Sequence, residues 1–463
     1  MKNSNKVTLV AVAVLAAVGA GIATSGIDGG GRARGAVTRF GSIFVNDVEY
    51  HLNTAQIRIN GAPATEADLR IGQVVTVDGF VNADLETGNA VTVEFDSDVR
   101  GLVASVDPVS ASMRVLGQTV RVNGGTTFDE AFTPANLGGV APGSVVEISG
   151  YRNSIGEVVA THVARSPAVS DRVLGTVADL DVGLGRFRIG ALTVDYSAAS
   201  LVEGGIANGA QVEVEGARAS GLLLRAQTIE TRSTGLGGEP GSGASLEGVV
   251  TGALAGGRFE VNGQPVVITP STQFLLGSIA DLVIDAKVEA EGRMDAAGAI
   301  VAQTVQFRWD DAAVATATVQ AVDARAGTIR VLGLTGKVDA GTRFEDRSDA
   351  RLRRMSLADL RVGDSVVVRG VELREARSML VTRITRERPG VTRLHARLTD
   401  LTPTGFRLVE LPVNLLPSTA TEEFDGRPVS RADFMRRAPN RNVNVRGTFD
   451  GVSLTAIEVT LEQ

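Results

Sequence analysis

The chain has 463 residues, a formal net charge of −7, no cysteine and an aromatic content of 4%. The absence of cysteine excludes disulfides, thiolate catalysis, iron–sulfur clusters and thiolate-bound zinc. The acidic balance argues against binding to nucleic acid or to anionic membrane surfaces. The 54 glycines, with apolar content mostly from Val, Leu, Ile and Ala, are typical of a β protein with many tight turns.

Residues 1–25 predict a signal peptide. Lys2 and Lys6 precede an aliphatic run over 7–23, and the small residues at 23–25 suit a signal peptidase. An uncleaved anchor is the alternative, because the run lies at the lower length limit of a membrane span. We favour cleavage, since a run rich in Ala and Gly is only weakly hydrophobic. We therefore expect a periplasmic or secreted bacterial protein with no stable membrane span after cleavage.

A valine-rich octet recurs six times and organises the rest of the chain. Its first copy is Gly72–Gly79, and the closing glycine returns every 66 to 78 residues. The six closing glycines are Gly79, Gly150, Gly216, Gly292, Gly370 and Gly447. Apolar and polar residues alternate in each copy, which predicts a strand with one face on a core. The glycines suit sharp turns or the close approach of another backbone.

These copies divide the chain into small β units. After a Gly-rich linker over 26–34, the predicted units cover residues 35–96, 97–167, 170–232, 246–309, 313–388 and 391–463. The Gly/Ser/Pro-rich stretch 233–245 predicts a linker that separates two arms of three units each.

Each unit shows the same order of predicted elements: a strand, a hairpin, a short helical turn, the octet strand and a closing strand. In the first unit these are a strand over 36–40, a hairpin over 42–51 and a helical turn over 67–71. This is the element order of an OB-type barrel, whose closure removes the exposed edges of a small sheet. We expect an all-β fold of six tandem small OB-like five-stranded barrels, each with one short helical turn. Stacked open meanders are the alternative.

Three segments resemble a known family. They are GSIFVNDVEY at 41–50, VLGQTV at 115–120 and GSVVEISG at 143–150. Such segments are similar to those of exported bacterial proteins that carry tandem copies of a small β domain of unknown function. Many relatives carry a lipid-bearing cysteine before the Gly-rich lead-in, where this chain has Ser25. The resemblance implies export and a repeated β unit, and it supplies no catalytic or binding residues.

The residues that most often carry chemistry are sparse. His51, His162 and His395 each lie in a predicted strand of a different unit, without a metal-ligating neighbour at suitable spacing, so we expect ordinary strand histidines.

Two acidic pairs, Asp96 with Asp98 and Asp179 with Asp181, lack the glycine-bearing loop that calcium requires. We expect solvated turn carboxylates, with adventitious calcium as the alternative. We predict no catalytic residue, cofactor or metal site.

Arginines gather in units five and six. A possible anionic-ligand surface there comprises Arg351, Arg353, Arg354, Arg436 and Arg437. Interleaved acidic residues favour a solvated, salt-bridged surface instead. The scarcity of aromatic side chains argues against stacking of nucleic-acid bases or sugars.

These observations predict a non-enzymatic exported protein that serves as a binding or structural module of the cell envelope. Its partner would be an envelope protein or polysaccharide. The alternative is a carrier or sensor of a small ligand or anionic polysaccharide through the Arg-rich C-terminal units, and a hydrolase is the third choice. A scaffold predicts exposed sheet faces or apolar patches at unit ends and no enclosed pocket. A ligand binder predicts one pocket repeated at equivalent loops, or one unit with a markedly different lining. An enzyme predicts converging titratable groups with shifted pKa values in a cleft.

Overall fold

The computed structural model describes residues 30–461 except 41, 83–86, 109, 169, 204, 219–221, 234, 309–312, 340, 374–376, 424–426 and 440. The predicted signal peptide lies outside the described residues. The chain divides into two lobes. The first comprises Met1–Val37 and Ser42–Arg308, and the second comprises Thr38–Gly41 and Trp309–Gln463.

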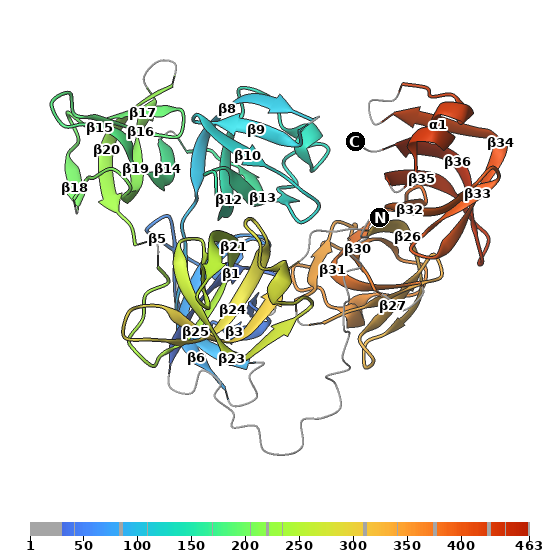
Figure 1. The fold of residues 1–463 in the computed structure, drawn as a ribbon, viewed down its shortest axis with the longest axis horizontal. Helices are drawn as coiled ribbons and strands as arrows, with labels where there is room; N and C mark the ends of the chain where they lie inside the picture. The colour runs from blue at the N-terminus through green and yellow to red at the C-terminus, as the bar shows by residue number, and fades with distance from the viewer. Residues whose placement is uncertain are drawn as a thin grey trace. The chain divides into compact units, whose positions relative to one another are not determined.

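The first lobe contains units one to four (Figure 1). Unit one has β1 (Gly31–Ala36), β2 (Ile43–Val45), β3 (Val48–His51), β4 (Gln56–Ile59), β5 (Ala62–Ala64), the 3-10 helix η1 (Glu66–Asp68), β6 (Val74–Val81) and β7 (Thr87–Phe95). Unit two has β8 (Val99–Asp107), β9 (Ser112–Val115), β10 (Gln118–Arg121), β11 (Thr127–Phe128), η2 (Leu137–Gly139), β12 (Val145–Arg152) and β13 (Val158–Arg165). Unit three has β14 (Asp171–Thr176), β15 (Ala178–Asp181), β16 (Arg186–Ile189), β17 (Leu192–Asp195), β18 (Leu201–Glu203), β19 (Gln211–Arg218) and β20 (Leu223–Thr231). Unit four has β21 (Gly243–Ala255), β22 (Arg258–Val261), β23 (Gln264–Leu275), η3 (Ile279–Asp281), β24 (Lys287–Met294) and β25 (Ile300–Phe307).

The second lobe contains units five and six. Unit five has β26 (Ala313–Asp323), β27 (Thr328–Val331), β28 (Leu334–Lys337), β29 (Arg343–Asp346), η4 (Leu357–Asp359), β30 (Ser365–Glu372) and β31 (Ser378–Glu387). Unit six has β32 (Arg393–Thr402), β33 (Gly405–Leu408), β34 (Leu411–Glu423), the helix α1 (Arg431–Arg437), β35 (Asn442–Phe449) and β36 (Leu454–Leu461).

Units four, five and six are closed five-strand barrels, so the all-β prediction is confirmed. In unit five the strands follow the order β27–β28–β31–β30–β26, and β26 pairs again with β27. The third strand, β28, runs parallel to the last, β31, and the other pairs are antiparallel. Unit two uses the same pairs, with β12 joined to both β8 and β13.

The short helical turn is present in units one, two, four and five, and unit six has a helix there, whereas the described residues of unit three include none. In units one and four the turn follows a Ser or Thr with Asp three residues later, as Thr65 with Asp68 and Ser278 with Asp281. In each of these two turns the Asp carboxylate accepts hydrogen bonds from the backbone N–H and the hydroxyl of the capping residue. Ser356 and Asp359 form the same capping box in unit five.

The six octets occupy equivalent positions: each is the next-to-last strand of its unit and pairs with both the first and the last strands. At each closing glycine the pairing with the last strand shifts register. A Cβ atom at Gly292 would lie 2.0 Å from the Val301 carbonyl oxygen. The corresponding distances at the other five closing glycines are 2.0 to 2.4 Å, again to a facing backbone oxygen. The repeated glycine therefore follows from a bulge at which two backbones touch.

The units associate in pairs through their first strands. β8 and β14 pair in antiparallel fashion, as do β26 and β32, whereas β1 and β21 are parallel. In β21 the N-terminal half pairs with β24 on one side and with β1 on the other. Without that neighbour, this half would present an unpaired edge. The resulting pairs are one with four, two with three, and five with six.

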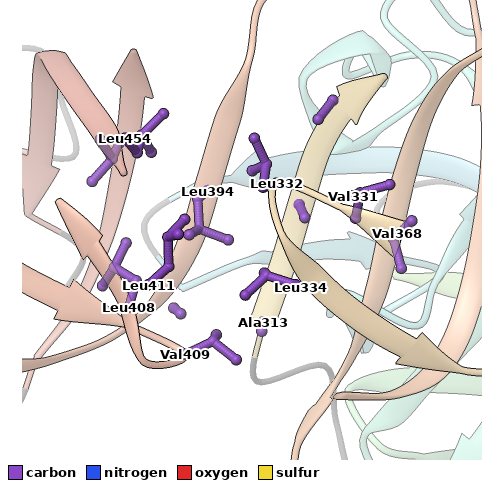
Figure 2. Packing of buried hydrophobic residues seen from close by; sticks show 14 of the residues in the cluster. Ala313, Val331, Leu332, Leu334, Val368, Leu394, Leu408, Val409, Leu411 and Leu454 are labelled. Atoms are coloured by element: carbon purple, nitrogen blue, oxygen red, sulfur yellow. The ribbon is translucent and has the colours of Figure 1, made fainter. Parts of the chain in front are cut away.

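Hairpin turns strengthen these pairs. Leu332 of the β27–β28 turn is 1% exposed although its φ is 51°, a conformation that costs a non-glycine residue energy. It belongs with Val409 of the β33–β34 turn to one apolar core that units five and six share (Figure 2). In unit two the Gln118 amide of the VLGQTV segment donates to the Ile189 carbonyl of unit three at 2.7 Å.

Two predicted boundaries require correction. The first strand covers Gly31–Ala36, so it begins inside the predicted linker 26–34 and ends before most of the predicted strand 36–40. The stretch 233–245 does not separate two arms of three units. Leu236 within it is buried, β21 begins at Gly243 and pairs with β1, and the division between lobes follows Arg308 instead.

The part of the chain that the structure describes holds no helix with the length and apolar character needed to cross a membrane.

We predict that Gly370→Ala lowers the free energy of unfolding by about 2–3 kcal/mol. The added Cβ would lie 2.1 Å from the Leu380 carbonyl oxygen, so the bulge must open. Gly390→Ala is the matched control, because its nearest atom is 3.8 Å away. Chemical denaturation of the full chain measures both, and equal effects of the two substitutions contradict the role assigned to the bulge.

Candidate functional site

The first lobe contains a partly open cavity of about 740 Å³. All four units of this lobe contribute to its wall. The charged residues that line it are Arg32, Arg34, Glu94, Asp96, Asp98, Arg152, Glu213, Arg232 and Glu260. A cavity of this size falls within the range of small-molecule sites, and its lining is unusually polar for one.

A small apolar cluster holds three of the units together beside the cavity. It joins Ala36 and Val74 of unit one, Tyr151 of unit two and Val249 of unit four, all of them buried. Val74 and Tyr151 also line the cavity. The Lys287 ammonium lies 5.4 Å from the centre of the Tyr151 ring, close enough for a cation–π contact.

Polar contacts tie the same units together. The Asn46 amide donates to the Ser245 hydroxyl at 2.7 Å, which joins the β2–β3 turn of unit one to unit four. Asp285 stands where the octets of units one, two, three and five open with glycine, and it keeps a positive φ of 66°. Its carboxylate accepts the Ser154 backbone N–H at 2.8 Å and the Ser154 hydroxyl at 3.2 Å. The departure from glycine thus provides a contact between units two and four.

A buried charge cluster completes the joint between units one and four. Glu289 of β24 is 6% exposed and forms an ion pair with Arg308, which also bonds Asp47 at 2.9 Å. Glu247 lies in the same cluster and pairs with Lys287 at 2.5 Å. Burial, with the nearby charges of Asp47 and Glu247, raises the pKa of Glu289 to about 7.

Ion pairs neutralise one side of the cavity wall. The Arg172 side chain is 3% exposed and contacts Asp96 and Glu213, each at 2.7 Å. Arg232 bonds Glu213 at 2.7 Å and Glu230 at 3.3 Å. Burial raises the pKa of Glu213, and the two arginines oppose that shift. These charges are therefore largely compensated within the protein.

Asp98 and Arg152 occupy a different part of the wall. Asp98 is 5% exposed, and its Oδ2 accepts the Gly150 backbone N–H at 2.9 Å, at the bulge of unit two. Arg152 donates to the Gly156 carbonyl at 2.9 Å, to the Leu174 carbonyl and to the Gln118 side chain. Burial raises the pKa of Asp98 and lowers the pKa of Arg152. Each group is thus held where its charged form is disfavoured.

The prediction of a solvated turn carboxylate is wrong for Asp98, which is buried, whereas the Asp96 side chain is 37% exposed. β7 ends at Phe95 and β8 begins at Val99, so the connection has three residues. That short spacing between two predicted strands is the sequence signal that would have identified Asp98. Asp179, in contrast, lies in β15 with a side chain that is 72% exposed beside Arg188. The described residues include no acidic or histidine cluster suited to a metal ion.

The three histidines lie apart from the cavity lining. His51 Nδ1 lies 3.0 Å from the Ser42 hydroxyl, and His162 Nδ1 lies 2.7 Å from the Thr127 hydroxyl. His395 pairs in register with Val314 in the sheet of the second lobe.

The arginines predicted as an anionic-ligand surface lie on two units of the second lobe. Arg351, Arg353 and Arg354 follow β29 in unit five, and the Arg353 guanidinium stacks on the Phe40 ring at 4.3 Å. Arg436 and Arg437 end α1 in unit six, where they pair with Asp433 at 2.5 Å and with Glu423. This surface stays a prediction, although acidic neighbours engage its unit-six members.

A family model described as "Domain of unknown function (DUF5666)" matches residues 100–164, 175–230, 247–306 and 316–385. These matches cover more than half of the chain and correspond to units two to five. The chain belongs to this family. None of the curated proteins compared with the chain matches it. Tandem copies of a domain of unknown function are thereby confirmed, whereas the GSIFVNDVEY segment of unit one lies outside the matched residues.

The joint between units one and four should weaken as pH rises. Because the folded state favours protonated Glu289, stability is greatest below the ordinary glutamate pKa and falls as pH increases through about 7. The parent protein should lose free energy of unfolding between pH 5 and 8, and we expect Glu289→Gln to make that loss smaller by on the order of 1–3 kcal/mol. Thermal denaturation across this range measures it. Glu260→Gln, at an exposed site on β22, is the control and should show the same change of stability with pH as the parent protein. If Glu289→Gln shows that same change, the joint does not titrate.

Proposed function

We propose that this protein is a non-enzymatic, exported binding module of the bacterial cell envelope, and that the cavity of the first lobe is its ligand site. The observation that carries the proposal is the cavity to which four units contribute, because a scaffold alone needs none. Its charged and amide-bearing wall suits a small polar ligand. The partner we expect is an envelope polysaccharide or a fragment of one.

We further propose that all six units are OB-like barrels. The order of the strands, with the third parallel to the last, supports this in units four to six. OB-type barrels bind oligosaccharides and oligonucleotides through loops and one sheet face. Here the net charge of −7 and the scarcity of aromatic residues favour a sugar over a nucleic acid.

A hydrolase is the second candidate, and Asp98 is the observation that favours it. A buried carboxyl group with a raised pKa in a cavity is a candidate general acid. The two other partly buried carboxylates of the wall, Asp96 and Glu213, are engaged by Arg172 and Arg232. We therefore rank binding above catalysis, and release of reducing sugar from envelope polysaccharide by the full chain would reverse that order.

Filling the cavity should abolish ligand binding. Thr176 lines the cavity and is exposed to it, so Thr176→Trp is expected to occupy the site without disturbing the core. The measurement is thermal stabilisation of the full chain by a panel of neutral and charged mono- and disaccharides. Thr399→Trp, at an exposed position of the second lobe, is the control. If no compound stabilises the parent protein, or if Thr176→Trp responds as the control does, the cavity is not the binding site.

A further inference from the structure

We propose that Arg34 and Arg152 form a carboxylate-binding corner of the cavity, and that its ligand is a small acidic sugar. This inference rests on the proposed function, because it assigns the chemistry of the ligand to the same cavity.

The two arginines are the cavity cations that form no ion pair in the described structure, although both lie near Asp98. Within the described residues, the Arg34 side chain on β1 makes no hydrogen bond or ion pair, although it is half-buried in the wall. Arg152 is bound by the Gly156 and Leu174 carbonyls and by the Gln118 amide, all neutral groups. Its Nε is buried and has no hydrogen-bond partner in the described structure. The charge of Arg152 is therefore met by neutral acceptors and by the nearby Asp98 carboxyl group rather than by an ion pair.

The remaining charges of the wall do not compete for this corner. Arg32 is held by Asp78 through two hydrogen bonds of 2.6 and 3.1 Å, and Arg232 is held by Glu213. Glu94 and Glu260 line the cavity but are exposed, so water screens their charge. The inner wall therefore carries an excess of positive charge around Asp98.

The protonation state of Asp98 makes the net positive charge of this corner depend on pH. Asp98 faces Arg152 of β12 and Arg34 of β1, and Asp96 of its own connection adds a repulsive charge. Burial raises the pKa of Asp98, which favours the neutral carboxyl group. A neutral Asp98 leaves both guanidinium charges to the ligand and offers an O–H donor as well. Binding of an anion should therefore strengthen as pH falls.

The rest of the wall indicates a sugar rather than a free inorganic anion. The hydroxyl groups of Thr76 and Thr176 and the amides of Gln211 and Asn262 line the same cavity. Such groups bind sugar hydroxyls, and the cavity volume of about 740 Å³ has room for a mono- or disaccharide.

Isothermal titration of the full chain with glucuronate, glucose and inorganic phosphate, each at pH 5.5 and 7.5, tests the assignment. We expect glucuronate to bind at least tenfold more tightly than glucose, and more tightly at pH 5.5. Arg34→Gln should weaken glucuronate binding by tenfold or more, since charge-assisted hydrogen bonds are lost. Arg34→Lys keeps the positive charge, so its affinity for glucuronate should lie between those of Arg34→Gln and the parent protein. Asp98→Asn should bind glucuronate with nearly the same affinity at pH 5.5 and at pH 7.5.

Arg58→Gln is the control, because Arg58 is exposed on β4 outside the cavity lining. It should bind as the parent does, and circular dichroism checks that every variant is folded. If glucose and glucuronate bind equally tightly, and Arg34→Gln changes neither affinity, the carboxylate-binding corner is overturned. The cavity would then still be a sugar site. Binding of phosphate but not glucuronate overturns the acidic sugar as the ligand. If glucuronate binding survives Thr176→Trp, the proposed cavity site fails with the inference.

Discussion

The open edge of each unit's first strand is the constraint on which the arrangement of units depends. The N-terminal half of this strand can pair with the octet strand on one side, and a neighbouring first strand satisfies the other. An unpaired strand edge is a site for uncontrolled association, so a second copy of the same unit is the simplest cover. The tandem repeat is therefore more than duplication, because every copy protects the edge of another.

The cavity follows from the order in which the edges are paired. Units two and three pair with each other, yet they lie in sequence between units one and four, which also pair. The connection from unit one to unit two has three residues, so the second pair cannot move away from the first. The chain at 233–236 returns beside the same wall, where Leu236 contributes its backbone carbonyl to Arg32 at 3.0 Å. Four β units held this closely leave a partly open cavity between them.

The local structure could be predicted from the sequence because it repeats. Each octet marks a strand, and each closing glycine marks a bulge where a facing carbonyl oxygen excludes a side chain. The pairing of units could not be predicted, because it depends on backbone edges that carry no residue signature. For the same reason the linker 233–245 resembled a division between arms, although β21 starts within it. Asp98 resembled a turn residue until neighbouring units buried it.

Positions that vary between copies are the ones most informative about function. The residue two places after the closing glycine is an arginine in units two and three, Arg152 and Arg218. It is Val81, Met294, Glu372 or Phe449 in units one, four, five and six. Folding of the barrel therefore does not require arginine there, yet in unit two this arginine lies in a cavity beside a buried carboxyl group. The bulge at Gly150 is shared by all six copies, and in unit two its free N–H holds Asp98. The bulge that every unit shares thus becomes part of a polar site in unit two, where residues that the other units do not all share lie beside it.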